Sequence, residues 1–324
     1  MNIRKAIVIP ILAVLGVSCA GAVLAIYNSV KASIQSFPEA LNSIPADYQF
    51  VFGVNVQKLT RSSAFMKLQQ NRQVSKDLDS FAEKTGLDPQ RDIHYLVGAG
   101  KTGNEGIMIA VGRFNKEKIT GYVRSKSAPL EKTYGGASVL MIPDAKNDSA
   151  RGKGIAFINE REIALGDLQS LKDVLDVGGR EDKSILSNQT MAPLIRSIDP
   201  EEMLWFAADA QSVLSRAPAK VPLGQNASSI RSFVGTLNIG DTVAGKITAT
   251  AVDPDSAVKL ADAIKGLIAL GQLTANQNPE LKTLLGGVAI SQNSTEVTLM
   301  VNFSPETLEK IRQSGKFNSL PILR

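Results

Sequence analysis

The sequence predicts an α+β protein made of two similar units, each an antiparallel sheet covered by helices on one face, preceded by one N-terminal transmembrane or signal helix. Three observations lead to this fold class. Residues 6–27 form an uncharged apolar stretch. The remaining chain mixes runs that alternate in polarity, as strands do, with runs of helical periodicity. The order of these runs repeats with a period of roughly 150 residues, which indicates an internal duplication.

The apolar stretch is long enough to cross a membrane, because about 20 apolar helical residues span the hydrocarbon core. Its membrane-spanning positions include Ala6, Ile9, Leu12, Leu15, Leu24 and Tyr27. Arg4 and Lys5 precede it, and basic flanks tend to stay in the cytoplasm. The sequence therefore predicts a single-pass protein of the bacterial inner membrane, with the C-terminal part in the periplasm or outside the cell.

Two other interpretations of this stretch stay open. Residues 20–22 (AGA) have the small side chains of a signal-peptide cleavage site, which would give a secreted or periplasmic protein. Residues 17–19 (VSC) partly match the acylation motif of lipoproteins at Cys19, although Gly16 stands where that motif has leucine. All three interpretations send the rest of the chain across the membrane.

Composition excludes several classes of protein. Residues 31–324 suffice for two domains of about 100–200 residues each. The single cysteine, Cys19, lies in the apolar stretch, so no intramolecular disulfide can form. The net charge of +5 is dispersed, and the aromatic residues, 5% of the chain, do not interleave with basic runs. A nucleic-acid partner is therefore not expected.

The expected organisation is a membrane anchor or signal segment over residues 1–30, a linker over 31–44, a first α+β unit over 45–180 and a second over 195–315. The first unit begins with a strand over 48–56, in which Phe50, Phe52, Val54 and Val56 alternate on one buried face. Further strands are expected at 93–98, 106–111, 138–142, 154–159 and 162–166. Helices are expected at 62–70 and 74–84, after the cap Asn115, and from the cap Asp167 to Gly178.

The second unit repeats this order. A strand over 202–208 leads into a helix over 209–216, and two strand pairs follow at 233–239 with 243–252 and at 287–292 with 296–302. Asp253 and Pro254 open the longest expected helix, because aspartate caps helices and proline suits the first position. Its apolar stripe comprises Ala257, Leu260, Ala261, Ile264, Leu267 and Ile268. A final helix begins at Ser304. The sequence does not determine whether the two sheets join edge to edge.

Three stretches carry a resemblance to known proteins: residues 45–56, residues 154–177, and the helix DPDSAVKLADAIKGLIAL with the LLGGVAISQNSTEVTLMVNF that follows it. They are similar to uncharacterised exported bacterial proteins with an N-terminal membrane segment and a duplicated domain of unknown function. The resemblance covers most of residues 40–315. It implies an extracytoplasmic domain and supplies no functional residues.

Two candidate catalytic motifs fail on context or order. Residues 95–102 (YLVGAGKT) end like a phosphate-binding loop, but Tyr95 replaces its first glycine and a strand follows instead of a helix. Ser256 and Lys259 match the Ser-x-x-Lys of penicillin-binding enzymes, and residues 101–103 match their Lys-Thr-Gly. The chain order of these two elements is reversed here, so Ser256 is expected in a first helical turn.

The remaining candidates are isolated. His94 is the single histidine, and its strand position predicts a side chain opposite Ile93 and Tyr95, exposed or paired across strands. Zinc sites draw on several cysteines and histidines, and no acidic ladder of a calcium loop is present. Carboxylates such as Glu201 and Asp253 precede strands or helices, where capping explains them. The sequence therefore nominates no catalytic residue, metal or cofactor.

These observations favour a membrane-anchored extracytoplasmic binding or interaction protein without enzymatic activity, with an envelope protein or a hydrophobic small molecule as partner. One alternative is a periplasmic protein that binds lipid or another hydrophobic ligand, because the apolar helix 257–270 would cover its sheet incompletely. Another is a hydrolase whose site forms no sequence motif. A deep pocket with convergent carboxylates would indicate the enzyme, and a large apolar surface would indicate the binding protein.

Overall fold

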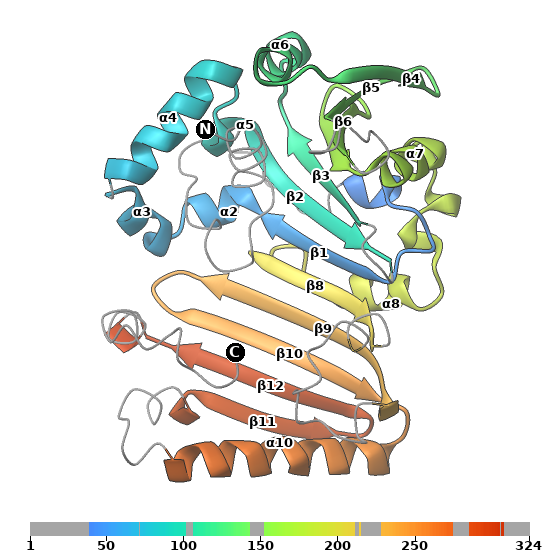
Figure 1. Cartoon of the computed structure of the whole chain (residues 1–324). Coiled ribbons are helices and arrows are strands. Elements are labelled where there is room, and N and C mark those ends of the chain that lie inside the picture. Colours follow the sequence, from blue (N-terminus) through green and yellow to red (C-terminus); the bar gives the residue numbers. More distant parts are fainter. Residues whose placement is uncertain are drawn as a thin grey trace. The chain divides into compact units, whose positions relative to one another are not determined.

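The computed structural model describes residues 39–70, 72–101, 106–142, 152–210, 214, 228–274, 285–304 and 306–307. The chain divides into two compact units, Met1–Leu204 and Trp205–Arg324. Both contain helices and strands (Figure 1), and every strand pair with a defined register is antiparallel. The α+β prediction is confirmed. The predicted membrane-spanning positions fall outside the described residues, and none of the described helices is long and apolar enough to cross a membrane.

The sheet of the first unit has the strand order β1-β2-β3-β7-β6-β5-β4. Its strands are β1 (Phe50–Asn55), β2 (Ile93–Gly100), β3 (Gly106–Gly112), β4 (Leu130–Tyr134), β5 (Ala137–Ile142), β6 (Lys153–Phe157) and β7 (Glu162–Gly166). All strands predicted for this unit are present. Strand β4 was not predicted, because its residues LEKTY are largely exposed and show no apolar alternation.

Local sequence signals set the ends of the helices in this unit. The helices are η1 (Glu39–Ser43), α2 (Val56–Thr60), α3 (Ser63–Gln69), α4 (Arg72–Thr85), α5 (Pro89–Asp92), α6 (Lys116–Lys126), α7 (Leu168–Val177), η2 (Glu181–Lys183), η3 (Ile185–Ser187) and α8 (Met191–Arg196). Asn115 and Asp167 cap α6 and α7, each by accepting the backbone N–H three residues on at 2.9 Å. Gly86 and Gly178 follow α4 and α7 with φ of +65° and +58°, values that favour glycine.

Helices lie on both faces of the first sheet, which corrects the expectation of a single covered face. Ile119 and Val123 of α6 pack on Ile155 of β6. The neighbouring residue Gly154 points to the opposite face, where it lies against Leu171 of α7. Strands β6 and β7 are consequently buried almost continuously, as is usual for strands covered on both sides.

Strand β1 also departs from its predicted pattern. Val51 is fully buried, whereas Phe50 and Phe52 are half-buried. The ring of Phe52 lies over Gly98, its partner in β2, where no room is left for a Cβ atom. Cross-strand packing on a glycine thus replaces the single buried face that alternation predicted.

The folded part of the first unit begins within the expected linker. Helix η1 covers Glu39–Ser43, and its Ala40 and Leu41 have no exposed surface. The division between the units falls between Leu204 and Trp205, so α8 belongs to the first unit. The domain bounds expected from the sequence, 45–180 and 195–315, stay a prediction.

The sheet of the second unit has the order β11-β12-β10-β9-β8. Its elements are β8 (Leu204–Asp209), β9 (Ile230–Ile239), β10 (Val243–Ala251), α10 (Pro254–Thr274), β11 (Val288–Asn293) and β12 (Glu296–Phe303). Asp253 accepts the N–H of Ser256 at 2.7 Å, so the predicted cap of α10 is confirmed. The helices predicted over 209–216 and after Ser304 lie largely outside the described residues.

The two sheets follow one rule of connection. Each unit starts with three strands that are neighbours in the order in which they occur in the chain, β1-β2-β3 and β8-β9-β10. The third strand leads into a helix, α6 or α10. The last strand of each sheet, β7 or β12, then returns to pair with that third strand.

Candidate apolar binding surface

Helix α10 changes in character along its length. The first part carries Asp255, Lys259, Asp262 and Lys265, whereas residues 266–274 (GLIALGQLT) carry no charge. A helix that is apolar on all sides is stable in water only where other groups cover it. Because a sheet packs against one side of a helix only, the apolar surface on the other sides of residues 266–274 needs some other group to cover it.

The first part of α10 is anchored in the core of the second unit. Ala257, Leu260 and Ala261 are at most 1% exposed and belong to one cluster with Ala249 of β10 and Val297 of β12. Their spacing of three and four residues places them on one side of the helix. The predicted stripe is thus confirmed as a core face over this part.

The second part of α10 leaves the core. Leu267, Leu270 and Leu273 are 39%, 61% and 68% exposed. These leucines are three residues apart, and a step of three residues turns an α-helix about 60° less than a full turn. Each leucine therefore points further from the sheet than the one before. Leu267 was predicted to face the core, and this is wrong because the stripe rotates off the sheet. We call Leu267, Leu270 and Leu273 the leucine surface.

The sheet beside α10 is also incompletely covered. Ile247 alternates with Ala249 on β10, so both side chains lie on the face that packs against the helix. Ala249 is buried there, whereas Ile247 is 44% exposed. The apolar face of this sheet therefore extends beyond the part that α10 covers.

A second apolar feature is a depression in the first unit between α4, α6 and the sheet, of about 440 Å³ with open solvent included. Its lining residues are Phe81, Thr85, Leu87, Ala110, Phe114, Ile119, Tyr122, Val123, Ile155, Ile163 and Leu165. The Thr85 hydroxyl donates to the carbonyl of Phe81 at 2.7 Å and accepts from the N–H of Leu87 at 3.1 Å. Pockets that orient a ligand offer free polar groups, and Thr85 offers none.

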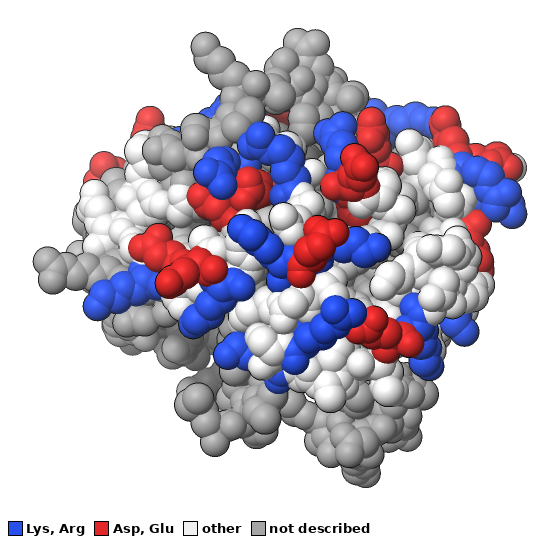
Figure 2. Space-filling model, turned by 90° about the horizontal axis from the view of Figure 1, so that it is seen from above, with Lys and Arg blue, Asp and Glu red and all other residues white. Residues whose placement is uncertain are grey.

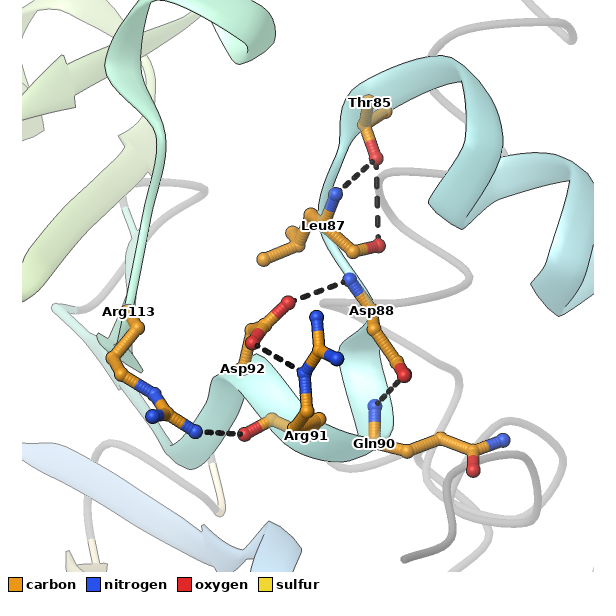
Figure 3. Close-up of polar contacts among 7 residues, drawn as sticks. All are labelled: Thr85, Leu87, Asp88, Gln90, Arg91, Asp92 and Arg113. Atoms are coloured by element: carbon orange, nitrogen blue, oxygen red, sulfur yellow. Dashed lines mark hydrogen bonds and ion pairs between the residues drawn. The ribbon is translucent and has the colours of Figure 1, made fainter.

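The polar contacts next to this depression hold a turn together (Figure 3). Asp88 caps α5 by accepting the N–H of Gln90 at 2.9 Å. Asp92 accepts the N–H of Asp88 at 2.8 Å with one carboxylate oxygen and Nε of Arg91 at 3.2 Å with the other. Arg113 reaches the carbonyl of Arg91 at 3.4 Å. Both oxygens of Asp92 are thus engaged in local structure.

Lys101, considered above as a phosphate-binding lysine, lies in an ion cluster. Its Nζ is 2.7 Å from Asp47 and 3.0 Å from Asp173, and 5.0 Å from the ring centre of Tyr48. Burial lowers the pKa of Lys101, but hydrogen bonds to Asp47 and Asp173 outweigh it and raise the pKa above its ordinary value. Burial raises the pKa of Tyr48 to about 12. Neither group changes charge near neutral pH, so the cluster is suited to tying segments together.

His94 lies at an irregularity between β2 and β3, where the register shifts between Ile93 and Tyr95. Its side chain is half-buried, and within the described structure its Nε2 has no hydrogen-bond partner. Burial and the nearby Arg113 lower the pKa of His94. Ile93 and Tyr95 are buried, as predicted, but His94 is neither fully exposed nor paired across the strands.

The other nominated polar residues serve local structure. The Ser256 hydroxyl donates to Asp253 at 3.0 Å in the first turn of α10, and Lys259 is exposed. This confirms the predicted role of Ser256. Glu201 lies in the turn before β8, where its N–H donates to Asp199 at 2.9 Å. Among the described residues no group of His, Cys, Asp or Glu is arranged to hold a metal ion.

One buried carboxylate escaped the sequence analysis. Glu162 at the start of β7 is 3% exposed, and its Oε2 accepts hydrogen bonds from Ser43 at 3.2 Å and Asn159 at 3.1 Å. Burial raises the pKa of Glu162. Ser43 lies 119 residues earlier in the chain, so only the fold brings the two together.

Charges are mixed on the face that Figure 2 shows. Lys and Arg side chains alternate with Asp and Glu among its coloured residues. A surface that follows a nucleic-acid backbone carries a continuous basic stripe. The residues visible on this face do not form one.

Comparisons with known proteins give little beyond this geometry. No known protein family and no curated protein matches the chain in sequence. Crystal form I of a protein named TP0453 is similar in structure with a TM-score of 0.48 and 9% identity, over 86% of this chain and 98% of that one. Crystal form IV gives 0.46 and 8%, over 84% and 95%. At TM-scores below 0.5 this likeness supports no inference about the present chain.

Proposed function

We propose that this chain is a membrane-anchored extracytoplasmic binding protein without enzymatic activity, and that its second unit binds the lipid of the membrane that anchors it. The observation that carries the proposal is the leucine surface at the uncharged end of α10, where Leu270 and Leu273 are 61% and 68% exposed. Grouped exposed apolar side chains mark sites for membranes or partners. Lipid is favoured because a bilayer accepts aliphatic side chains without a shaped counterpart.

The anchor expected at residues 6–27 supports lipid as the occupant. Helix η1 begins at Glu39, so residues 28–38 connect anchor and fold. Fully extended at roughly 3.5 Å per residue, they reach at most about 40 Å. The first unit would therefore stay near a bilayer, and so would the second unit, because both are parts of one chain. A weak contact between the leucine surface and lipid would then act at high effective concentration.

The polar side chains of the described residues support a binding role over catalysis. Lys101 is engaged by Asp47 and Asp173, and Ser256 by Asp253. The hydroxyl of Ser256 contacts a helix-capping carboxylate, which holds it in the first turn of α10.

We also infer that the two units arose by internal duplication. In chain order, β1, β2, β3, α6, β6 and β7 correspond to β8, β9, β10, α10, β11 and β12. One packing detail supports this: Phe52 of β1 lies over Gly98 of β2, and Phe206 of β8 lies over Gly235 of β9. A Cβ atom would collide with the ring at both glycines. The extra hairpin β4–β5 distinguishes the first unit.

Vesicle co-sedimentation of residues 32–324 tests lipid binding. Removing residues 1–31 removes the anchor and no described residue. Burying the exposed parts of two leucines contributes about 1–2 kcal/mol each. The double change Leu270→Ser and Leu273→Ser should therefore weaken partition into phosphatidylethanolamine–phosphatidylglycerol vesicles by roughly 30-fold or more.

Val258→Ser is the matched control, because Val258 is 46% exposed in the charged part of α10. This variant should bind vesicles like the unchanged chain. Equal binding by all three proteins, or no binding by the unchanged chain, would overturn the lipid proposal. In the second case an envelope protein would become the better candidate for the leucine surface.

A further inference from the structure

Strand β11 is the end strand of the sheet in the second unit. Its register with β12 pairs Ala289 with Met300 and Ser291 with Thr298. Just beyond the strand, the N–H of Asn302 in β12 donates to the carbonyl of Gly287 at 3.0 Å. The backbone N–H and C=O groups of the even-numbered residues of β12 therefore form hydrogen bonds toward β11.

The backbone hydrogen bonds on the other side of β12, toward β10, agree with this alternation. There the N–H of Ala251 at the end of β10 donates to the carbonyl of Thr295 at 2.8 Å, so odd-numbered residues of β12 bond toward β10. Bonded pairs alternate along an antiparallel ladder. The backbone N–H and C=O groups of Val288, Ile290 and Gln292 consequently point away from β12, toward the outer edge of the sheet.

We infer that this edge binds the β11 strand of a second copy of the chain. Positions 288, 290 and 292 are symmetric about Ile290. In a two-fold antiparallel pairing, Ile290 faces Ile290 of the second copy and Val288 faces Gln292. This register engages every outward backbone group and forms about six hydrogen bonds. The contact is isologous, so it closes as a dimer.

The composition of β11 permits this pairing. Its residues VAISQN include no charge and no proline. Exposed edge strands usually carry charges or proline that prevent pairing with another chain. The end strand of the first unit, β4, carries Glu131 and Lys132. A two-fold pairing of β11 brings no like charges face to face.

The first unit contains a strand that has no counterpart among the described residues of the second unit. In strand order β6 stands where β11 stands, next to the last strand of its sheet. Strand β5 pairs antiparallel along the outer edge of β6, with Val139 opposite Ala156. The described part of the second unit supplies no such strand. The equivalent edge in this same protein is thus completed by an antiparallel neighbour.

A single strand pair is a small interface, below the roughly 1,200 Å² of stable complexes. Self-association is therefore expected to be weak in dilute solution. Anchoring both copies in one membrane raises their effective concentration. The test accordingly uses the full chain in the membrane of the expressing cell.

Disulfide trapping tests the register. On the proposed axis, Ala289 of one copy faces Ser291 of the other as a non-bonded pair, with Cα atoms about 4.5 Å apart and within disulfide reach. Both residues are exposed, and Cys19 is the single native cysteine. On a Cys19→Ser background, Ala289→Cys and Ser291→Cys chains with different tags are co-expressed, oxidised in the membrane and separated without reductant. The mixed pair should form a disulfide-linked dimer well above either variant alone, because neither residue faces itself.

Gln292 provides the matched pair of variants. Gln292→Pro removes an N–H that points outward, so it costs no bond to β12. It should lower the mixed disulfide about tenfold or more by removing about two hydrogen bonds from the dimer. Gln292→Ala keeps the N–H and should leave the disulfide unchanged. Absence of the mixed dimer, or its persistence in Gln292→Pro, would refute self-pairing, whatever the outcome for lipid binding.

Discussion

Replacing Lys101 by methionine removes the ammonium group of the ion cluster and keeps the aliphatic chain. Lys101 directly follows β2, Asp173 lies on α7, and Asp47 lies between η1 and β1. The side chains of Lys101 and Asp173 are 21% and 19% exposed, whereas that of Asp47 is 63% exposed. The two ion pairs of one lysine therefore differ in how far water screens them.

The expected loss of stability follows from these exposures. An exposed ion pair such as Lys101–Asp47 contributes about 0.2–1 kcal/mol. The shielded, charge-assisted hydrogen bond to Asp173 contributes about 1.5–3 kcal/mol. Contact of the ammonium with the Tyr48 ring contributes about 0.5–1 kcal/mol. Lys101→Met should therefore destabilise the first unit by about 2–5 kcal/mol, or roughly 5–20 °C in its melting temperature.

Urea denaturation of residues 32–324 and a double-mutant cycle measure the two pairs separately. Asp173→Asn and Asp47→Asn are combined in turn with Lys101→Met. The coupling energy with Asp173 should exceed that with Asp47, and only the Asp47 coupling should vanish in 1 M salt, where the Debye length is about 3 Å. Equal couplings, or a larger coupling with Asp47, would show that burial does not decide the strength of these pairs.

Further predictions concern the buried Glu162 and two glycines, one buried and one exposed. Because burial raises the pKa of Glu162, the folded chain holds this proton more tightly than the unfolded chain, and the resulting stability is lost as pH rises through the folded pKa. Glu162→Gln should reduce this loss, because Ser43 can still donate to the amide oxygen. Urea denaturation between pH 4 and 8 measures the effect. A steeper loss of stability with pH in the variant would contradict the raised pKa of Glu162. Gly98→Ala should destabilise by about 1–3 kcal/mol because its Cβ would meet the Phe52 ring. Gly121→Ala in α6, with nothing within 4 Å, should instead stabilise by about 0.5–1 kcal/mol, and equal denaturation midpoints would refute the contrast.

The candidate surface was only partly predictable from sequence. The cap at Asp253 and the buried Ala257 and Leu260 follow from spacing within α10. The uncharged run that follows was a signal for uncovered apolar surface. Periodicity nonetheless assigned Leu267 to the core, because it assumes that a helix stays on its sheet over its full length.

The sequence by itself determined most strands of this protein and the helices with clear caps. Caps such as Asn115 and Asp167 satisfy backbone groups three residues away, and alternation within β12 needs no distant partner. Such signals act over a few residues, so they can be read without a fold. The predicted anchor over residues 6–27 is equally local and stays a prediction.

Only the tertiary structure decided which strands are neighbours and which surfaces are covered. The contact between Glu162 and Ser43 joins residues 119 apart. The return of β7 to β3 and of β12 to β10 leaves β11 at an edge, although its sequence reads like that of an inner strand. These arrangements depend on closing long loops and on burying apolar area collectively. No short stretch of sequence contains that information.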